Sequence, residues 1–265
     1  MMFSFIWLLI LTYAGLVSPA DVYSSSQVRS IFILAGQSNM SGRGGVVNNT
    51  WNGVVPIQSK PNPTKILRLN AGLKWVGAQE PLHKDIDVNA TCGVGPGMAF
   101  ANSLLNQDPR IGTIGLVPCA VGSYMGTKIS QWGRGTFLYR QLVRRTRAAA
   151  GDNMGKIRAL LWYQGESDTK DPRDAVMYKR RLERMLNSLR ADLQLPSLQV
   201  VVVAITSGQG PYVNVVRTAQ FGLQLPNVMV VDAKGLPLSP DNLHLSTPAQ
   251  VRLGEMIAKK IPPSD

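Results

Sequence analysis

The stretch Ile31-Phe-Ile-Leu-Ala-Gly-Gln-Ser-Asn-Met40 begins with five apolar residues and turns polar at a glycine. A short apolar run rich in β-branched residues and bounded by turn residues is typical of a strand buried on both faces. Four further runs of this kind follow: Ile111 to Val117, Ile157 to Tyr163, Leu198 to Thr206 and Val228 to Asp232. About five such strands predict a central parallel sheet, because parallel sheets are usually covered on both faces.

Helix-like segments separate these runs, as a parallel sheet requires. We expect helices over Gly97 to Asn106, Thr136 to Ala150, Pro172 to Leu193, Val213 to Leu225 and Pro248 to Lys260. Pro172 and Pro248 suit the first helical turn, where a missing N–H costs nothing, and Thr247 is a natural N-cap. The alternation predicts an α/β chain.

The segment from Gly42 to Gly95 interrupts this alternation. It is rich in glycine, proline and asparagine, and only Lys65 to Leu69 and Lys74 to Val76 look extended. Long loops inside compact domains are usually functional. We therefore expect one domain over residues 21–265, with a long loop insertion around residues 42–95.

The first twenty residues differ from the rest. Phe3 to Val17 is almost uninterruptedly apolar, and Ser18-Pro-Ala20 then supplies the small residues of a cleavage site. We interpret residues 1–20 as a signal peptide, with a retained anchor as the alternative. After cleavage we expect a secreted protein without stable membrane insertion, because no later stretch approaches the roughly 20 apolar residues that span a bilayer.

Export affects how the cysteines and asparagines are interpreted. Cys92 and Cys119 could form one disulfide outside the cytosol, or they could be two small buried side chains. Asn48 and Asn89 each begin a glycosylation acceptor pattern, so we expect a glycoprotein.

The chain has 265 residues, and 28 lysines and arginines against 16 acidic residues leave a net charge of +12. The clustered arginines lie in helix-like segments whose apolar residues would face inward, and there is neither zinc-finger spacing nor an aromatic platform. We therefore expect no nucleic-acid partner. In an exported protein the positive charge favours an anionic polysaccharide surface, such as a cell wall.

Ligands of open α/β sheets bind at the carboxyl ends of the strands. The chain has only two histidines, His83 and His244, and two distant cysteines, which make a poor metal-binding set. The segment Gly122 to Lys128 lacks the spacing of a phosphate-binding loop. We expect neither a metal nor another cofactor.

Serine catalysis remains. Ser38 follows a buried strand at a glycine turn, and Asp241 and His244 are three residues apart, so one turn of chain could carry both the base and the carboxylate that orients it. Each of these residues alone could have a structural role, but together they indicate a hydrolase. The paired acids of a glycosidase fit less well, because Glu166 and Asp168 are only two residues apart.

Gly36-Gln-Ser-Asn-Met40, Trp162-Tyr-Gln-Gly-Glu-Ser-Asp168 and Asp241-Asn-Leu-His244 together resemble the SGNH-type carbohydrate esterases. The chain looks most like plant members of the sialate O-acetylesterase-like domain family, carbohydrate esterase family 6. This resemblance covers about Arg29 to Ile261. It implies a flavodoxin-like three-layer α/β/α fold and removal of acetyl groups from sugars without a metal.

The resemblance implies a role for each matching residue. Ser38 would be the nucleophile, His244 the general base and then acid, and Asp241 the carboxylate that orients the imidazole. The oxyanion hole would use the N–H of Ser38, the N–H of Gly126 or alternatively Gly122, and the side chain of Gln164. The candidates for the substrate cleft are Gln37, Asn39, His83 and Glu166. For His83 a surface position is the alternative, and for Glu166 the alternative is support of local structure.

Two departures from the family pattern affect the function. Gln164 stands where the broader superfamily usually has asparagine, and Ser123-Tyr-Met125 looks inserted where relatives more often have adjacent glycines followed by threonine. The insertion could narrow or disable the crevice. The leading hypothesis is an exported serine esterase acting on an acetylated carbohydrate, with xylan as the first guess. The alternative from another class is a non-catalytic or weakly catalytic glycan-binding protein on the same fold. A lipase is disfavoured because the Gly-x-Ser-x-Gly elbow is missing.

Overall fold

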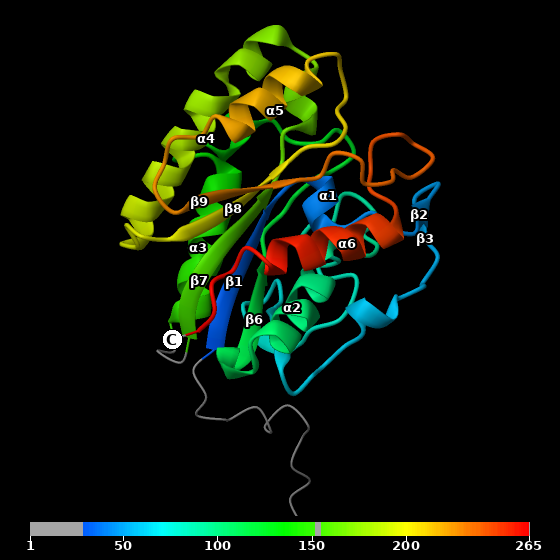
Figure 1. The fold of residues 1–265 in the computed structure, drawn as a ribbon, viewed down its shortest axis with the longest axis vertical. Coiled ribbons are helices and arrows are strands. Elements are labelled where there is room, and N and C mark those ends of the chain that lie inside the picture. Colours follow the sequence, from blue (N-terminus) through cyan, green and yellow to red (C-terminus); the bar gives the residue numbers. More distant parts are fainter. Residues whose placement is uncertain (1–28, 152–154, 265) are drawn as a thin grey trace, which may run out of the picture.

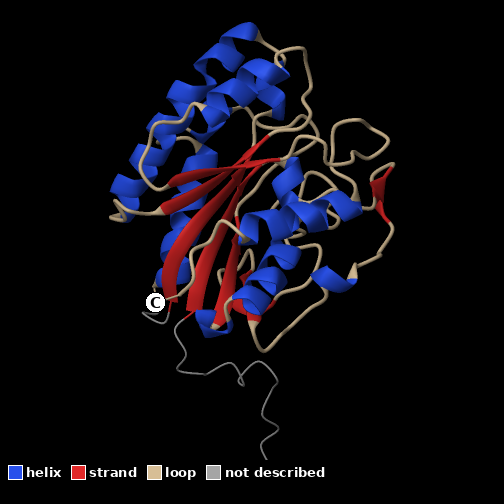
Figure 2. Cartoon of the chain, in the orientation of Figure 1, coloured by secondary structure: helices blue, strands red, loops and turns tan. Residues whose placement is uncertain are grey.

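The computed structural model describes residues 29–151 and 155–264, and a mostly parallel sheet lies at its centre (Figure 2). Its strands are β1 (Arg29–Gly36), β4 (Ile66–Leu69), β5 (Trp75–Gly77), β6 (Thr113–Pro118), β7 (Gly155–Tyr163), β8 (Gln199–Ala204) and β9 (Val228–Asp232). They are ordered β5-β4-β6-β1-β7-β8-β9. All neighbouring strands are parallel except β4 and β5, which are antiparallel.

Each of the five predicted strands is present, but the sheet has seven strands rather than about five. The two additional strands, β4 and β5, come from the predicted insertion, where the sequence already looked extended. They are short and lie at one edge of the sheet, so they lack the long apolar run of a central strand. The predicted α/β class is confirmed, and the single-domain assignment stays a prediction.

Helices cover both faces of the sheet (Figure 1). They are α2 (Pro96–Gln107), α3 (Phe137–Ala150), α4 (Pro172–Leu193), α5 (Val213–Phe221) and α6 (Thr247–Ala258). Helices α2 and α6 pack together on one face, α3 and α4 lie on the other, and α5 packs beside α4. Gly254 permits the close approach of α6 to α2, because a Cβ there would lie 2.4 Å from the carbonyl oxygen of Pro96.

Helix boundaries follow local chemistry. The Asp171 side chain accepts hydrogen bonds from the N–H groups of Arg173 and Asp174 at the start of α4, which satisfies donors that the helix itself leaves free. The predicted N-cap Thr247 is instead the first residue of α6, and Ser246 precedes it without a side-chain cap bond. Helix α5 ends at Phe221, earlier than the predicted Leu225.

The core lies on both sides of the sheet. Ile31 to Ala35 of β1 are completely buried, in keeping with their central position. Trp132 and Trp162 meet edge to face with ring centroids 5.1 Å apart, a geometry that aromatic rings favour. Replacing such a large buried ring by alanine typically costs about 3 to 5 kcal/mol, so these rings anchor the face that α3 and α4 cover.

The cysteines are free. Cys92 and Cys119 are both buried and unpaired, and burial raises the pKa of each thiol to about 11. The interpretation as two small buried side chains is therefore confirmed, and the disulfide alternative is wrong.

The two glycosylation candidates lie on the surface. Asn48 occupies the turn of a small hairpin formed by β2 (Val46–Val47) and β3 (Thr50–Trp51), and Asn89 is exposed in a loop. The predicted signal peptide, residues 1–20, falls outside the described residues. Within residues 29–151 and 155–264, no helix is long and apolar enough to cross a membrane.

Candidate active site

Three strand ends meet where the site was predicted. Strand β1 leads directly into the buried four-residue helix α1 (Ser38–Ser41). The N–H of Gln37 donates to the carbonyl of Tyr163 at the end of β7, and the N–H of Val121 after β6 donates to the carbonyl of Gly36. These two bonds tie the end of β1 to the end of β7 and to the chain that follows β6. Ser38, Gly122 and Gln164 follow these three strands and therefore lie at the same edge of the sheet.

A continuous chain of hydrogen bonds joins Ser38, His244 and Asp241. The Ser38 Oγ lies 2.9 Å from His244 Nε2, and His244 Nδ1 lies 2.6 Å from Asp241 Oδ2. The other carboxylate oxygen of Asp241 accepts the backbone N–H groups of Leu243 and His244, each at 2.9 Å. The short Asp241–His244 turn therefore holds base and carboxylate together, as their spacing predicted.

The electrostatics favour a neutral imidazole. Partial burial lowers the pKa of His244 below its usual 6.5, although Asp241 opposes this shift by stabilising the charged ring. For Asp241, burial raises the pKa, but the backbone N–H bonds from His244 and Leu243 together with the His244 side chain outweigh it, so the net pKa is lowered. At neutral pH the pair is thus a carboxylate beside a neutral ring that can accept a proton.

Asn39 connects the nucleophile's helix to the segment that carries the base. Its side-chain oxygen accepts the N–H of Leu245 at 2.9 Å, and its amide nitrogen donates to the Glu166 carboxylate at 2.7 Å. Both Asn39 and Glu166 are fully buried. Their predicted place in the substrate cleft is therefore wrong, and the structural alternative for Glu166 is confirmed, with Asn39 as its partner.

Glu166→Gln is expected to stabilise the protein more at pH 8 than at pH 5. Burial raises the pKa of Glu166 to about 7 from 4.5. The free energy of unfolding of the wild-type protein therefore falls as the pH rises between these two values. Glutamine retains an oxygen acceptor for Asn39 and does not ionise. The free energy of unfolding of the mutant minus that of the wild type should grow by up to about 3 kcal/mol between pH 5 and pH 8. Urea unfolding measures this difference.

A mutant-minus-wild-type difference in the free energy of unfolding that stays flat between pH 5 and pH 8 would contradict the assignment of an ionisation cost to Glu166.

Gln37 and His83 are also buried rather than cleft-lining. The Gln37 side chain is fully buried and accepts a bond from the Gln164 amide. His83 is 1% exposed, and burial lowers its pKa to about 3, so its ring is neutral. Neither the cleft position of His83 nor its surface alternative holds, because the loop after β5 folds it inward.

The Gln164 side chain faces inward. Its amide nitrogen donates to the Asp168 carboxylate at 2.7 Å, to the Thr127 carbonyl at 2.5 Å and to Gln37 at 3.2 Å. An amide has only two N–H groups, so none remains for an oxyanion. The structure therefore contradicts the predicted oxyanion role of Gln164 and shows that it braces the loop after β6.

Gly122, the fallback, lies against the nucleophile. A Cβ on Gly122 would be 2.7 Å from the nitrogen of Ser38, whereas one on Gly126 would be 2.0 Å from Ser167 Oγ. Neither Ser38 nor Gly122 uses its N–H to bond another described residue. The backbone of Gly122 therefore lies against Ser38 and that of Gly126 lies against Ser167, which favours the fallback, Gly122, as the oxyanion glycine.

The inserted Ser123-Tyr-Met125 bulges outward. Tyr124 and Met125 are 69% and 72% exposed, and the N–H of Ser123 donates to the Asp87 carboxylate at 2.9 Å. The two large side chains of the insertion therefore point into solvent and do not fill the space beside Ser38.

Sequence reasoning missed Arg43 and Asp87. Their buried ion pair is 2.6 Å long, and Asp87 also accepts bonds from Ser41 and from the N–H of Ser123. One carboxylate thus joins α1 to the loop that carries Gly122. The two residues are 44 positions apart, so no local pattern could have paired them.

Gly122→Ala is expected to lower kcat/KM for ester hydrolysis about 10²- to 10³-fold, because the new methyl group would displace an oxyanion donor from Ser38. The assay is hydrolysis of an aryl acetate by protein whose circular dichroism matches wild type. Gly133→Ala is the matched control, since a Cβ there meets only the Ser130 carbonyl at 3.6 Å. Equal activities of the two variants would refute the role of Gly122.

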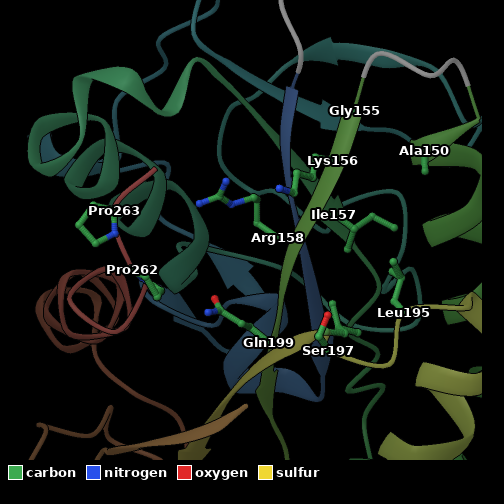
Figure 3. A pocket seen from close by; sticks show the side chains of 11 residues that line it. Ala150, Gly155, Lys156, Ile157, Arg158, Leu195, Ser197, Gln199, Pro262 and Pro263 are labelled. Atoms are coloured by element: carbon green, nitrogen blue, oxygen red, sulfur yellow. The ribbon is translucent and has the colours of Figure 1, made fainter. Parts of the chain in front are cut away.

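A separate hollow of about 610 Å³ lies at the opposite ends of β7 and β8 (Figure 3). Lys156, Arg158 and Gln199 are among its lining residues, and it contains no predicted site residue. Among the described residues, no cluster of three or more histidine, cysteine or acidic side chains could hold a metal ion.

Comparison with known proteins places this geometry in a family. The family model "carbohydrate esterase, sialic acid-specific acetylesterase" matches residues 28–262. A probable carbohydrate esterase from Arabidopsis thaliana is 50% identical over 256 residues, which cover 92% of this chain and 96% of that protein. A crystal structure of an Arabidopsis thaliana protein is 52% identical with a TM-score of 0.83, over 88% of this chain and 97% of that one.

More distant structures share the fold. NanS is 21% identical with a TM-score of 0.69, over 88% of this chain and 96% of its own. A carbohydrate acetylesterase from Xanthomonas citri is 19% identical with a TM-score of 0.61, over 86% of this chain and 55% of its own. From the family match and the Arabidopsis relative we conclude that this chain belongs to the carbohydrate esterase, sialic acid-specific acetylesterase family, whose members hydrolyse acetyl esters on carbohydrates.

Proposed function

We propose that the chain is an exported serine esterase that removes acetyl groups from a polysaccharide or oligosaccharide through an acyl-enzyme. The observation that carries this proposal is the unbroken sequence of bonds from Ser38 through His244 to Asp241. A serine activated by an oriented histidine is the arrangement that acyl transfer requires.

In the first half-reaction His244 Nε2 takes the proton of Ser38 Oγ as this oxygen attacks the acetyl carbonyl. The N–H groups of Ser38 and Gly122 stabilise the resulting oxyanion, each contributing about 3 to 4 kcal/mol in comparable sites. His244 then gives its proton to the departing sugar oxygen, which leaves an acetyl group on Ser38. Water then attacks this ester as His244 takes its proton, and His244 returns that proton to Ser38 Oγ as acetic acid leaves, while Asp241 orients the ring throughout.

Acetylated xylan is the first substrate to test. The experiment measures acetate release by the mature protein from acetylated xylan and, in parallel, from a small aryl acetate. Release from both supports the proposal, and release from the aryl ester alone rejects xylan but keeps the esterase. No release from either ester by the folded protein would reject the esterase.

A non-catalytic glycan-binding protein is the alternative, motivated by the inserted Ser123-Tyr-Met125. The exposure of Tyr124 and Met125 disfavours it, since the insertion leaves the bond between Ser38 and His244 in place. A serine-reactive phosphonate distinguishes the two. Stoichiometric labelling of Ser38 supports the esterase, whereas glycan retention without labelling supports the binding protein.

We further propose export to the cell wall or apoplast. The apolar leader over residues 1–20, the exposed acceptor asparagines Asn48 and Asn89 and the charge of +12 support this proposal. Mass spectrometry of the secreted protein should give an N-terminus near Asp21 and glycan on at least one acceptor. Secreted material that begins at Met1 would contradict cleavage.

The kcat/KM for an aryl acetate is expected to rise with pH and to reach half its maximum below pH 6.5. The lowered pKa of His244 keeps the ring neutral at a lower pH than an unperturbed histidine, and only the neutral ring acts as a base. A pH profile between about pH 4 and pH 9, over which the fold is checked by circular dichroism, measures the midpoint. A midpoint above pH 6.5 would contradict this prediction.

A further inference from the structure

Helix α3 carries a row of exposed arginines. Arg140, Arg144 and Arg147 are spaced i, i+4 and i+7 and therefore share one face of the helix. The helix contains no acidic residue. Like charges at this spacing cost roughly 0.2 to 0.5 kcal/mol per pair, so the row opposes the stability of its own helix.

Among the described residues, these three guanidinium groups have only neutral hydrogen-bond partners. Arg140 donates to the carbonyl of Gly135 at 2.6 Å, Arg144 to the side-chain oxygen of Gln141 at 3.4 Å, and Arg147 to the carbonyl of Asp192 at 2.6 Å. None of these bonds compensates a positive charge. On neighbouring α4, by contrast, Lys179 pairs with Glu183 and Arg181 with Asp174.

The row lines a hollow of about 420 Å³, which we call the arginine groove. Its lining residues are Arg134, Gly135, Tyr139, Arg140, Val143, Arg144, Arg147 and Asp192. The Asp192 carboxylate already accepts bonds from Arg134 and from the hydroxyl of Tyr139. The groove therefore carries positive charge that its own acidic residue does not balance.

A second hollow borders both the arginine groove and the chain that leads to Gly122. It has a volume of about 180 Å³, shares Arg144 with the groove and extends to Val121, which immediately precedes Gly122. Phe137, which is 64% exposed, and Gln141 also line it. An exposed aromatic ring and an amide are suited to the apolar face and the hydroxyl groups of a sugar ring.

We propose that the arginine groove binds the carboxylate groups of an acidic polysaccharide whose acetyl esters are cleaved at Ser38. The substrate chain would run from Ser38 past Val121 and Phe137 and place its uronate residues against Arg140, Arg144 and Arg147. Guanidinium groups bind carboxylates through paired hydrogen bonds, so the row selects an acidic over a neutral chain. This inference rests on the proposed esterase function and specifies its substrate class.

The test compares two triple variants of the full mature chain. Arg140→Gln, Arg144→Gln and Arg147→Gln together neutralise the groove. Arg173→Gln, Arg180→Gln and Arg184→Gln remove the same charge from the exposed surface of α4. The substrates are acetylated polygalacturonate, an acetylated neutral glucan and an aryl acetate, each at low and at high salt.

We expect the groove variant to raise KM for acetylated polygalacturonate by about tenfold or more at low salt. Its kinetics on the neutral glucan and the aryl acetate should equal those of wild type, and the α4 variant should match wild type on all three substrates. High salt should reduce the difference. An equal effect of both triple variants, or none from the groove variant, would overturn the proposal.

Binding of non-acetylated polygalacturonate, measured by calorimetry, separates failure of this inference from failure of the proposed function. If the wild-type protein is inactive but only the groove variant loses affinity for polygalacturonate, the binding site is supported and the esterase is rejected. If the wild-type protein is active but the groove variant loses affinity for duplex DNA and not for polygalacturonate, the esterase is supported and the polysaccharide assignment is overturned.

Discussion

Ser38→Ala is expected to lower kcat for acetate release by about 10⁴-fold or more, with little change in the free energy of unfolding. The Oγ of Ser38 is the atom placed 2.9 Å from His244 Nε2, and alanine has no nucleophile to accept the acetyl group. Activity that remains would come from binding and the oxyanion donors, which alone supply only a small part of catalysis in such enzymes. Acetate release and aryl acetate hydrolysis measure the effect.

The matched control is Ser130→Ala, because Ser130 is an exposed serine outside the hydrogen-bond chain. It should retain wild-type activity. Substantial turnover by Ser38→Ala, at a rate that persists after repeated purification, would require another nucleophile and would reject the proposed acyl-enzyme.

Asp241→Asn is expected to lower kcat by about 10³- to 10⁴-fold. The carboxylate accepts a bond from His244 Nδ1 at 2.6 Å, which keeps the proton on Nδ1 and leaves Nε2 free to act as the base. An asparagine amide that donates to Nδ1 reverses this tautomer, so that Nε2 carries a proton and no longer accepts one from Ser38. Steady-state kinetics on the aryl acetate at pH 7 and pH 9 measure the loss.

Asp232→Asn is the matched control, since the exposed fractions of the two aspartates are similar, 44% for Asp232 and 49% for Asp241. Asp232 pairs with Arg217 away from Ser38, so its loss should affect stability slightly and kcat hardly at all. Equal losses of kcat in the two variants would indicate a general structural effect and contradict the role of Asp241.

The contacts of Asp87 explain why the site tolerates an insertion next to Gly122. Asp87 holds the N–H of Ser123 and the hydroxyl of Ser41 at the same time, so the start of the inserted segment is tied to the nucleophile's helix. Gly122 stays against Ser38 while Tyr124 and Met125 project into solvent. A buried ion pair with Arg43 keeps Asp87 charged for this purpose.

Local sequence patterns alone predicted the five long strands, the five long helices and the grouping of Ser38, His244 and Asp241. Buried parallel strands require continuous apolar runs, and these can be recognised one segment at a time. The Asp241–His244 pair lies within one turn, and Ser38 follows directly after the most apolar run. Since parallel strands end at one edge of the sheet, placing these residues together needed no knowledge of side-chain packing.

The direction in which the polar residues beside Ser38 point, towards the substrate or towards the core, depended on long-range packing. Gln37, Asn39, Gln164 and Glu166 are neighbours of the site in sequence, yet their side chains bond one another or distant backbone inside the protein. A one-residue step at a strand end turns a side chain to the opposite side. The choice between Gly122 and Gly126 likewise depended on a long-range contact, the hydrogen bond between Ser123 and Asp87, which are 36 residues apart. Side-chain directions and long-range contacts follow from packing and not from local sequence patterns.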